Sequence, residues 1–263
     1  MFLFDLQGYL LLKNVLTVAE VAELNAIADR EFPCPPEPQG ERTAPSVMLW
    51  GEPYVALLDH PKVVPYLRGV LGARFRLDHD YGIFMRPGDS RGSLHGGEGN
   101  MDDWWYACRD GVIRNGLCTL IYFLTPAQTG EGGFACIPGS HKSRFLAAIP
   151  EEVRNFRRAA PYVEQPAVEA GDVVLFTEAL VHGTMPWNGS QERRIALFKY
   201  GPGHCASSNK FYDLEAMPTL TERQRLLLSP PSLYNRPEVP MQTGEESKQD
   251  HAMYAQIADE HLH

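Results

Sequence analysis

The sequence predicts a mainly β protein with flanking helices, because helical patterns come first and many short β-type segments follow. From residue 73 onward the apolar runs become short and rich in β-branched and aromatic residues. Glycine-containing turns separate these runs, for example at 130–133 and 188–190. This order is typical of a β-sandwich or a double-stranded barrel with helices packed against one face.

Two helices are predicted before the β region. The first begins at a capping box formed by Thr17 and Glu20, and its apolar residues recur at helical spacing to position 30. Pro61 opens the second helix and Gly72 ends it. The other N-terminal elements are a strand at 8–13 and a proline-rich loop at 32–40.

Strand patterns continue to position 200, and the first of them is expected to break near Gly82. The predicted strands are 75–85, 116–124, 134–137, 163–168, 173–176 and 195–200. A further helix is expected at 221–228, where Pro230 and Pro231 stop it. No repeat or linker divides the chain, so 1–263 is predicted to be one domain with a polar tail from position 242.

The composition narrows the classes of molecule that this protein is expected to bind. The formal charge of −9 argues against nucleic acid, which needs clustered Lys and Arg, and gives no support for an anionic membrane surface. There is no run of 18 apolar residues and no signal-peptide pattern, so we expect no membrane span. The five cysteines are odd in number and form no C-x-x-C pair, which indicates reduced thiols and a cytoplasmic protein.

Two histidines and an arginine suggest a metal site. His95 and His182 lie far apart in the chain and would meet only if the strands between them formed a barrel. Neutral imidazoles suit Fe(II), and two of them with one carboxylate leave coordination positions open for O₂ and a cosubstrate. The acid expected two residues after the first histidine is missing, because position 97 is glycine.

Arg193 fits a cosubstrate that chelates the metal and carries a second carboxylate, as 2-oxoglutarate does. A buried guanidinium pairs with a carboxylate in bidentate fashion, which lysine cannot match. Arg193 and Arg194 begin a predicted strand, and adjacent strand residues face opposite ways. Only one of them can point at the site, and we favour Arg193.

Residues 5–202 resemble the phytanoyl-CoA dioxygenase family of Fe(II)/2-oxoglutarate oxygenases. The resemblance rests on four motifs that are specific only in combination. They are Gly8-Tyr9, Gly132-Gly133-Phe134 leading to Pro138-Gly139-Ser140-His141-Lys142, Gly171 to Phe176, and His182-Gly183-Thr184 with Asn188, Ser190 and Arg193. The family implies a jelly-roll, cupin-like core with the site inside its mouth.

The same resemblance implies roles for individual residues. His95 and His182 would bind iron, and Arg193 would hold the distal carboxylate of 2-oxoglutarate, with Thr119 and Thr184 as supporting hydroxyls on facing strands. Tyr106 follows the His95 loop, so it is a candidate for an aromatic wall of the pocket, with simple packing as the alternative.

Gly97 leaves several readings open. A His-x-Gly pattern resembles the iron halogenases, in which chloride takes the position of the missing acid. Alternatively, Glu98, Asp102 or Asp103 supplies a substitute carboxylate.

We therefore expect an oxygenase that uses O₂ to hydroxylate or halogenate a C–H bond of a small organic substrate. The rival hypotheses are a catalytically silent jelly-roll protein that binds a small acid and a cupin-like metalloenzyme that does not use 2-oxoglutarate. The sequence indicates neither the substrate nor the oligomeric state.

Overall fold

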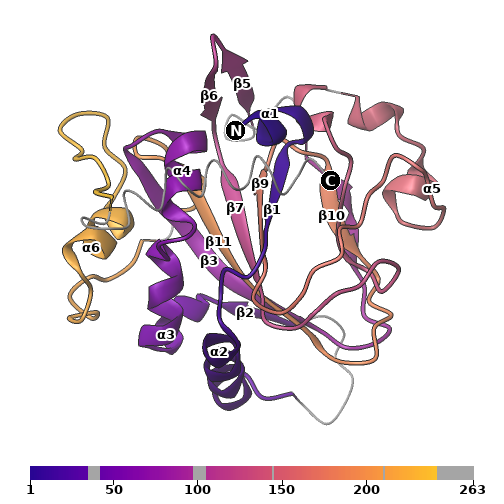
Figure 1. The fold of residues 1–263 in the computed structure, drawn as a ribbon, viewed down its shortest axis with the longest axis horizontal. Coiled ribbons are helices and arrows are strands. Elements are labelled where there is room, and N and C mark those ends of the chain that lie inside the picture. The colour runs from indigo at the N-terminus through magenta and orange to yellow at the C-terminus, as the bar shows by residue number, and fades with distance from the viewer. Residues whose placement is uncertain (35–41, 97–104, 144, 210, 242–263) are drawn as a thin grey trace.

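The computed structural model describes residues 1–34, 42–96, 105–143, 145–209 and 211–241, and within them the chain is mostly antiparallel β-sheet (Figure 1). The largest sheet has six strands in the order β1-β9-β7-β11-β3-β2, and a second has three in the order β4-β10-β8. A separate hairpin joins β5 and β6. The strands are β1 (Tyr9–Leu12), β2 (Arg42–Pro45), β3 (Phe75–Met85), β4 (Arg91–His95), β5 (Tyr106–Arg109), β6 (Val112–Asn115), β7 (Cys118–Phe123), β8 (Gly133–Cys136), β9 (Val173–Thr177), β10 (His182–Met185) and β11 (Arg193–Pro202).

Side chains alternate across the large sheet and build two cores. On one face, Ile121, Phe176 and Leu197 pack with Phe134 and Cys136 of the small sheet. The two sheets therefore form a sandwich, which confirms the predicted jelly-roll core. The site lies between these sheets.

The opposite face of the large sheet is covered by helices, as Figure 1 shows for α3 and α4. Hydroxyls of the buried Tyr122 and Tyr200 donate to the carbonyls of Leu57 and Leu58, each at 2.7 Å, and tie this helical layer to the sheet. The α-helices are α1 (Phe2–Gln7), α2 (Val18–Glu31), α3 (Glu52–Val55), α4 (Val64–Leu71), α5 (Glu151–Arg154) and α6 (Glu222–Leu228), and the 3-10 helices are η1 (Val47–Trp50), η2 (Ala56–Asp59), η3 (Ser140–Lys142) and η4 (Leu146–Ala148).

Several local predictions are confirmed. The capping box of Thr17 and Glu20 is formed at the start of α2. The helix predicted at 221–228 is present as α6, and it begins with a capping box of Thr221 and Gln224 that the sequence analysis did not name. The predicted helix that was to begin at Pro61 begins at Val64 instead, after a turn.

Two strand predictions are wrong. Gly82 does not break β3, because its backbone pairs with β11 on one side and β2 on the other. A Cβ at Gly82 would lie 2.8 Å from Val47 Cγ1, so packing of the helical layer explains the glycine. Residues 163–168 form isolated bridges at Glu164 and Val168 rather than a strand, since Pro166 has no N–H to donate.

The tail from position 242 lies outside the described residues. All five cysteines lie inside them, and none of them forms a disulfide. Across the described ranges, no helix combines the length and the apolar character needed to cross a membrane.

Candidate active site

A small cavity of about 100 Å³ lies between the two sheets and collects most of the predicted site residues. It is lined by polar side chains from β4, β10, β11 and the segment before β10, together with apolar side chains of the sandwich core. The polar residues are His95, Glu178, His182, Thr184, Arg193 and Lys199.

The structure brings His95 and His182 side by side. They are directly paired across the antiparallel β4–β10 ladder, and their ring centroids are 4.4 Å apart. Gly96 makes this approach possible. Its φ is 99°, and a Cβ there would lie 2.3 Å from the carbonyl oxygen of Leu180.

Both imidazoles are oriented by a backbone carbonyl two residues earlier. His95 Nδ1 lies 2.8 Å from the Ser93 carbonyl oxygen, and His182 Nδ1 lies 2.7 Å from that of Leu180. A carbonyl only accepts, so each Nδ1 carries the hydrogen and Nε2 is the nitrogen suited to a metal. Burial lowers the pKa of His182 to about 4, which keeps the ring neutral near pH 7.

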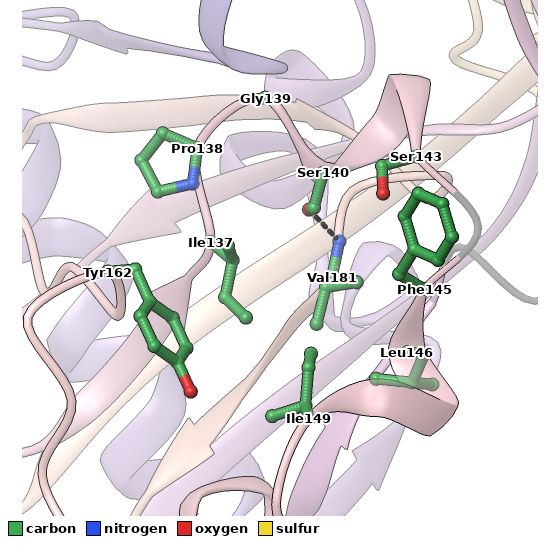
Figure 2. Close-up of a pocket in the computed structure, with 10 residues that line it drawn as sticks. All are labelled: Ile137, Pro138, Gly139, Ser140, Ser143, Phe145, Leu146, Ile149, Tyr162 and Val181. Atoms are coloured by element: carbon green, nitrogen blue, oxygen red, sulfur yellow. Dashed lines mark hydrogen bonds between the residues drawn. The ribbon is translucent and has the colours of Figure 1, made fainter.

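The residue before His182 anchors the start of β10. The Val181 N–H donates to Ser140 Oγ at 2.8 Å, and the Val181 carbonyl accepts from the Ile137 N–H, also at 2.8 Å. Figure 2 shows the side chain of Val181 turned into an apolar hollow with Leu146 and Ile149. Val181 thus packs on one side of the strand, and His182 faces the cavity on the other.

Arg193 points into the cavity and Arg194 points away from it. Arg193 is fully buried, with 0% of its surface exposed, and its Nη1 lies 3.4 Å from Met85 Sδ. Gly133 lies against the guanidinium, because a Cβ there would be 2.7 Å from Arg193 Nε. Arg194 instead pairs with Asp29 of α2 and with Glu192, both at 2.7 Å, on the helix-covered face of the large sheet.

The sequence analysis missed a buried ion pair beside the histidines. Glu178 is 1% exposed, and its Oε1 accepts from Lys199 Nζ at 2.9 Å and from the Thr119 hydroxyl. Burial raises the pKa of Glu178, but Lys199 foremost and then the other partners outweigh burial and bring it to about 2. The sequence feature that could have revealed Glu178 is its position as a lone acid in the apolar run that precedes His182.

The remaining predicted residues are placed differently. Thr184 lines the cavity, whereas Thr119 reaches it through its hydrogen bond to Glu178. Tyr106 lies elsewhere: its hydroxyl donates to Asp5 at 2.7 Å, and its ring packs edge-on against His141. Gly97, Glu98, Asp102 and Asp103 lie outside the described residues.

The donor set fits a divalent metal and a dicarboxylate. Two imidazoles with oriented Nε2 atoms suit Fe(II), and the buried guanidinium suits a carboxylate. Arg193 and Lys199 lie at opposite ends of the cavity-facing side of β11, since six residues of extended strand span about 20 Å. Within the described ranges, no three His, Cys, Asp or Glu side chains already converge as a formed metal site requires.

Comparisons with known proteins agree with this architecture. A family model described as phytanoyl-CoA dioxygenase (PhyH) matches residues 55–195. HygX from Streptomyces hygroscopicus with nickel and 2-oxoglutarate bound is similar with a TM-score of 0.70 and 25% identity, over 78% of this chain and 87% of that chain. The HygX structure with nickel, 2-oxoglutarate and hygromycin B bound has a TM-score of 0.68 and 26% identity, over 78% of this chain and 87% of that chain.

The iron-bound HygX structure has the same fold, with a TM-score of 0.66 and 24% identity over 78% of this chain and 86% of that chain. The family match covers more than half of the sequence and includes both histidines and Arg193. The chain therefore belongs to the phytanoyl-CoA dioxygenase family, the family of Fe(II)/2-oxoglutarate oxygenases that its sequence resembles.

Proposed function

We propose that this protein uses Fe(II), 2-oxoglutarate and O₂ to oxidise a C–H bond of a small organic substrate. The observation that carries the proposal is one cavity lined by His95, His182 and Arg193. The HygX structures support it, because they hold nickel or iron, 2-oxoglutarate and, in one case, the small molecule hygromycin B.

Four of the six polar residues of the cavity then have a defined task. His95 and His182 would hold the iron through Nε2, and Arg193 would bind the far carboxylate of 2-oxoglutarate, with Thr184 as a supporting hydroxyl in the same cavity. When bound, the iron and 2-oxoglutarate would supply the electrons that activate O₂, and the protein contributes orientation and an enclosure. The apolar walls formed by Ile83, Phe176 and Leu197 exclude water from this enclosure.

A larger hollow of about 580 Å³ adjoins the cavity and suits a small-molecule substrate. Tyr81 lines both spaces, so it marks the boundary between them. The walls of the hollow combine aromatic and acidic side chains, among them Phe211, Tyr212 and Asp213. A substrate held there would present one end to the metal past Tyr81.

The reaction outcome depends on what completes the metal shell. A carboxylate gives an ordinary hydroxylase. A halide in the position that Gly97 leaves without an acid would give a halogenase. Gly97 is the observation that keeps halogenation as the second candidate.

An anaerobic titration with Fe(II) and 2-oxoglutarate tests the proposal. The wild-type protein should develop the visible charge-transfer band of an iron–2-oxoglutarate complex, and His182→Ala should abolish it. His204→Ala is the matched control, because His204 is exposed and lies outside the cavity. Absence of the band in the wild type, or its persistence in His182→Ala, would refute the assignment. Absence of the band with intact metal binding would favour the cupin-like alternative.

A further inference from the structure

Two buried acceptor atoms face each other in the active-site cavity. Nε2 of His182 and Oε2 of Glu178 are 3.8 Å apart, and the two side chains are almost fully buried. His182 carries its hydrogen on Nδ1, so Nε2 presents a lone pair. Oε2 of Glu178 has no hydrogen-bond partner. A buried carboxylate oxygen without a partner is costly, which indicates that a ligand belongs between these two atoms.

The separation matches that of two ligands on one metal ion. Bonds of about 2.1 Å place two ligand atoms roughly 3 Å apart at a right angle and about 4.2 Å apart on opposite sides of the metal. The observed 3.8 Å lies within that interval. A direct hydrogen bond would be shorter, and neither atom carries a hydrogen to donate.

We propose that Glu178 is the carboxylate ligand of the metal and replaces the acid that Gly97 cannot provide; this inference rests on the proposed function. The ligand set is then His95, His182 and Glu178. It contains the two imidazoles and one carboxylate that Fe(II) prefers, although the carboxylate comes from the segment before the second histidine.

The surroundings of Glu178 suit this role. Its other oxygen, Oε1, is held by Lys199 and by the Thr119 hydroxyl, which fixes the carboxylate and leaves Oε2 for the metal. Gly96 keeps the His95 strand close, because a Cβ there would lie 3.0 Å from the Glu178 carbonyl oxygen. Since three ligands do not yet converge among the described residues, we expect metal binding to draw Oε2 toward His95.

The reaction outcome follows from this assignment. A carboxylate from Glu178 neutralises one charge of the metal and fills the position that a halide would take. Hydroxylation is then the expected reaction, and chloride has no place in the shell. The same spectroscopic titration that tests for 2-oxoglutarate can test this point.

The first experiment measures Co(II) binding to the full-length protein by its visible absorption. Glu178→Gln keeps the size of the side chain and removes its charge. It should weaken Co(II) binding by more than the roughly 10–100-fold that loss of an outer-shell partner costs. Glu98→Gln makes the same chemical change at the acid that follows Gly97 and should leave the affinity unchanged.

A second variant guards against misfolding. Glu178→Gln leaves the Lys199 ammonium, whose side chain is 14% exposed, without its carboxylate, which destabilises the fold. Glu178→Gln combined with Lys199→Met removes both charges and should fold well, yet bind Co(II) as weakly as Glu178→Gln. A structure of the Co(II)-loaded wild type should place Oε2 within about 2.2 Å of the metal.

The outcomes separate this inference from the proposed function. Tight Co(II) binding by both Glu178 variants, or a metal-bound carboxylate from Glu98, Asp102 or Asp103, would overturn the role of Glu178 alone. Absence of Co(II) binding in the wild type would overturn the proposed function as well. Chloride should not change the anaerobic iron–2-oxoglutarate spectrum of the wild type, and it should do so in Glu178→Gln. A chloride-sensitive wild type would contradict the inference.

Discussion

Replacement of Arg193 by lysine tests the cosubstrate site most directly. The guanidinium is fully buried at the end of the cavity, where Met85 and Gly133 pack around it. Lysine keeps the positive charge but presents a single ammonium group, so one of the two parallel hydrogen bonds to the distal carboxylate is lost. Water cannot easily replace that bond at a site with no exposed surface.

The size of the effect follows from this one lost bond. A hydrogen bond to a charged group contributes about 1.5–3 kcal/mol. Since about 1.4 kcal/mol corresponds to a factor of ten, Arg193→Lys should raise the Kd for 2-oxoglutarate by roughly 10–150-fold. Iron binding should not change, because the histidines lie on other strands.

The assay is an anaerobic titration of the Fe(II)-loaded protein with 2-oxoglutarate at fixed salt. Arg194→Lys is the control, since Arg194 pairs with Asp29 and Glu192 at the partly exposed outer side of the sheet. Such pairs contribute at most about 1 kcal/mol to stability, and the Kd should stay the same. A larger rise in Kd for Arg194→Lys than for Arg193→Lys would show that the assignment of Arg193 is wrong.

Three further predictions concern stability, measured by urea denaturation of the metal-free protein. Lys199→Met should lower the free energy of unfolding by about 3–5 kcal/mol, because it leaves the Glu178 carboxylate buried without its cation, and adding Glu178→Gln should recover part of that loss. Tyr122→Phe should cost about 1–3 kcal/mol, since the buried carbonyl of Leu57 loses its donor; an unchanged midpoint would argue against that contact. Burial lowers the pKa of His141 from 6.5 to about 4, so the unfolded state binds more protons between these values, and stability should fall as the pH drops from 6.5 to 4. His141→Gln should flatten this pH dependence, and an equally steep curve in that variant would contradict the assignment.

Local sequence signals determined much of the fold. The capping box at Thr17 depends on residues three positions apart, so the start of α2 could be read directly from the chain. The apolar β-forming runs around Ile121, Val174 and Leu197 identified the central strands, because residues buried on both faces of a sheet leave a strong pattern. The motifs around His182 and Arg193 identified the family.

Contacts between distant segments decided the rest. The sequence predicted a strand break at Gly82, but Gly82 pairs with both neighbouring strands. It also predicted a strand at 163–168, where Pro166 lacks an N–H and only isolated bridges form. Alternation required that only one of Arg193 and Arg194 face the site, and the pairing of β11 with β3 and β7 chose Arg193.

Glu178 shows most clearly which functional residues the sequence alone does not reveal. In the sequence it is a single acid in an apolar run. Its meaning depends on Lys199 and Thr119 from other strands and on its 3.8 Å separation from His182. Residue type and local spacing determined which chemistry the chain contains. Only the tertiary structure decided which of these groups share one cavity, because burial and strand register arise from contacts between segments that are far apart in the chain.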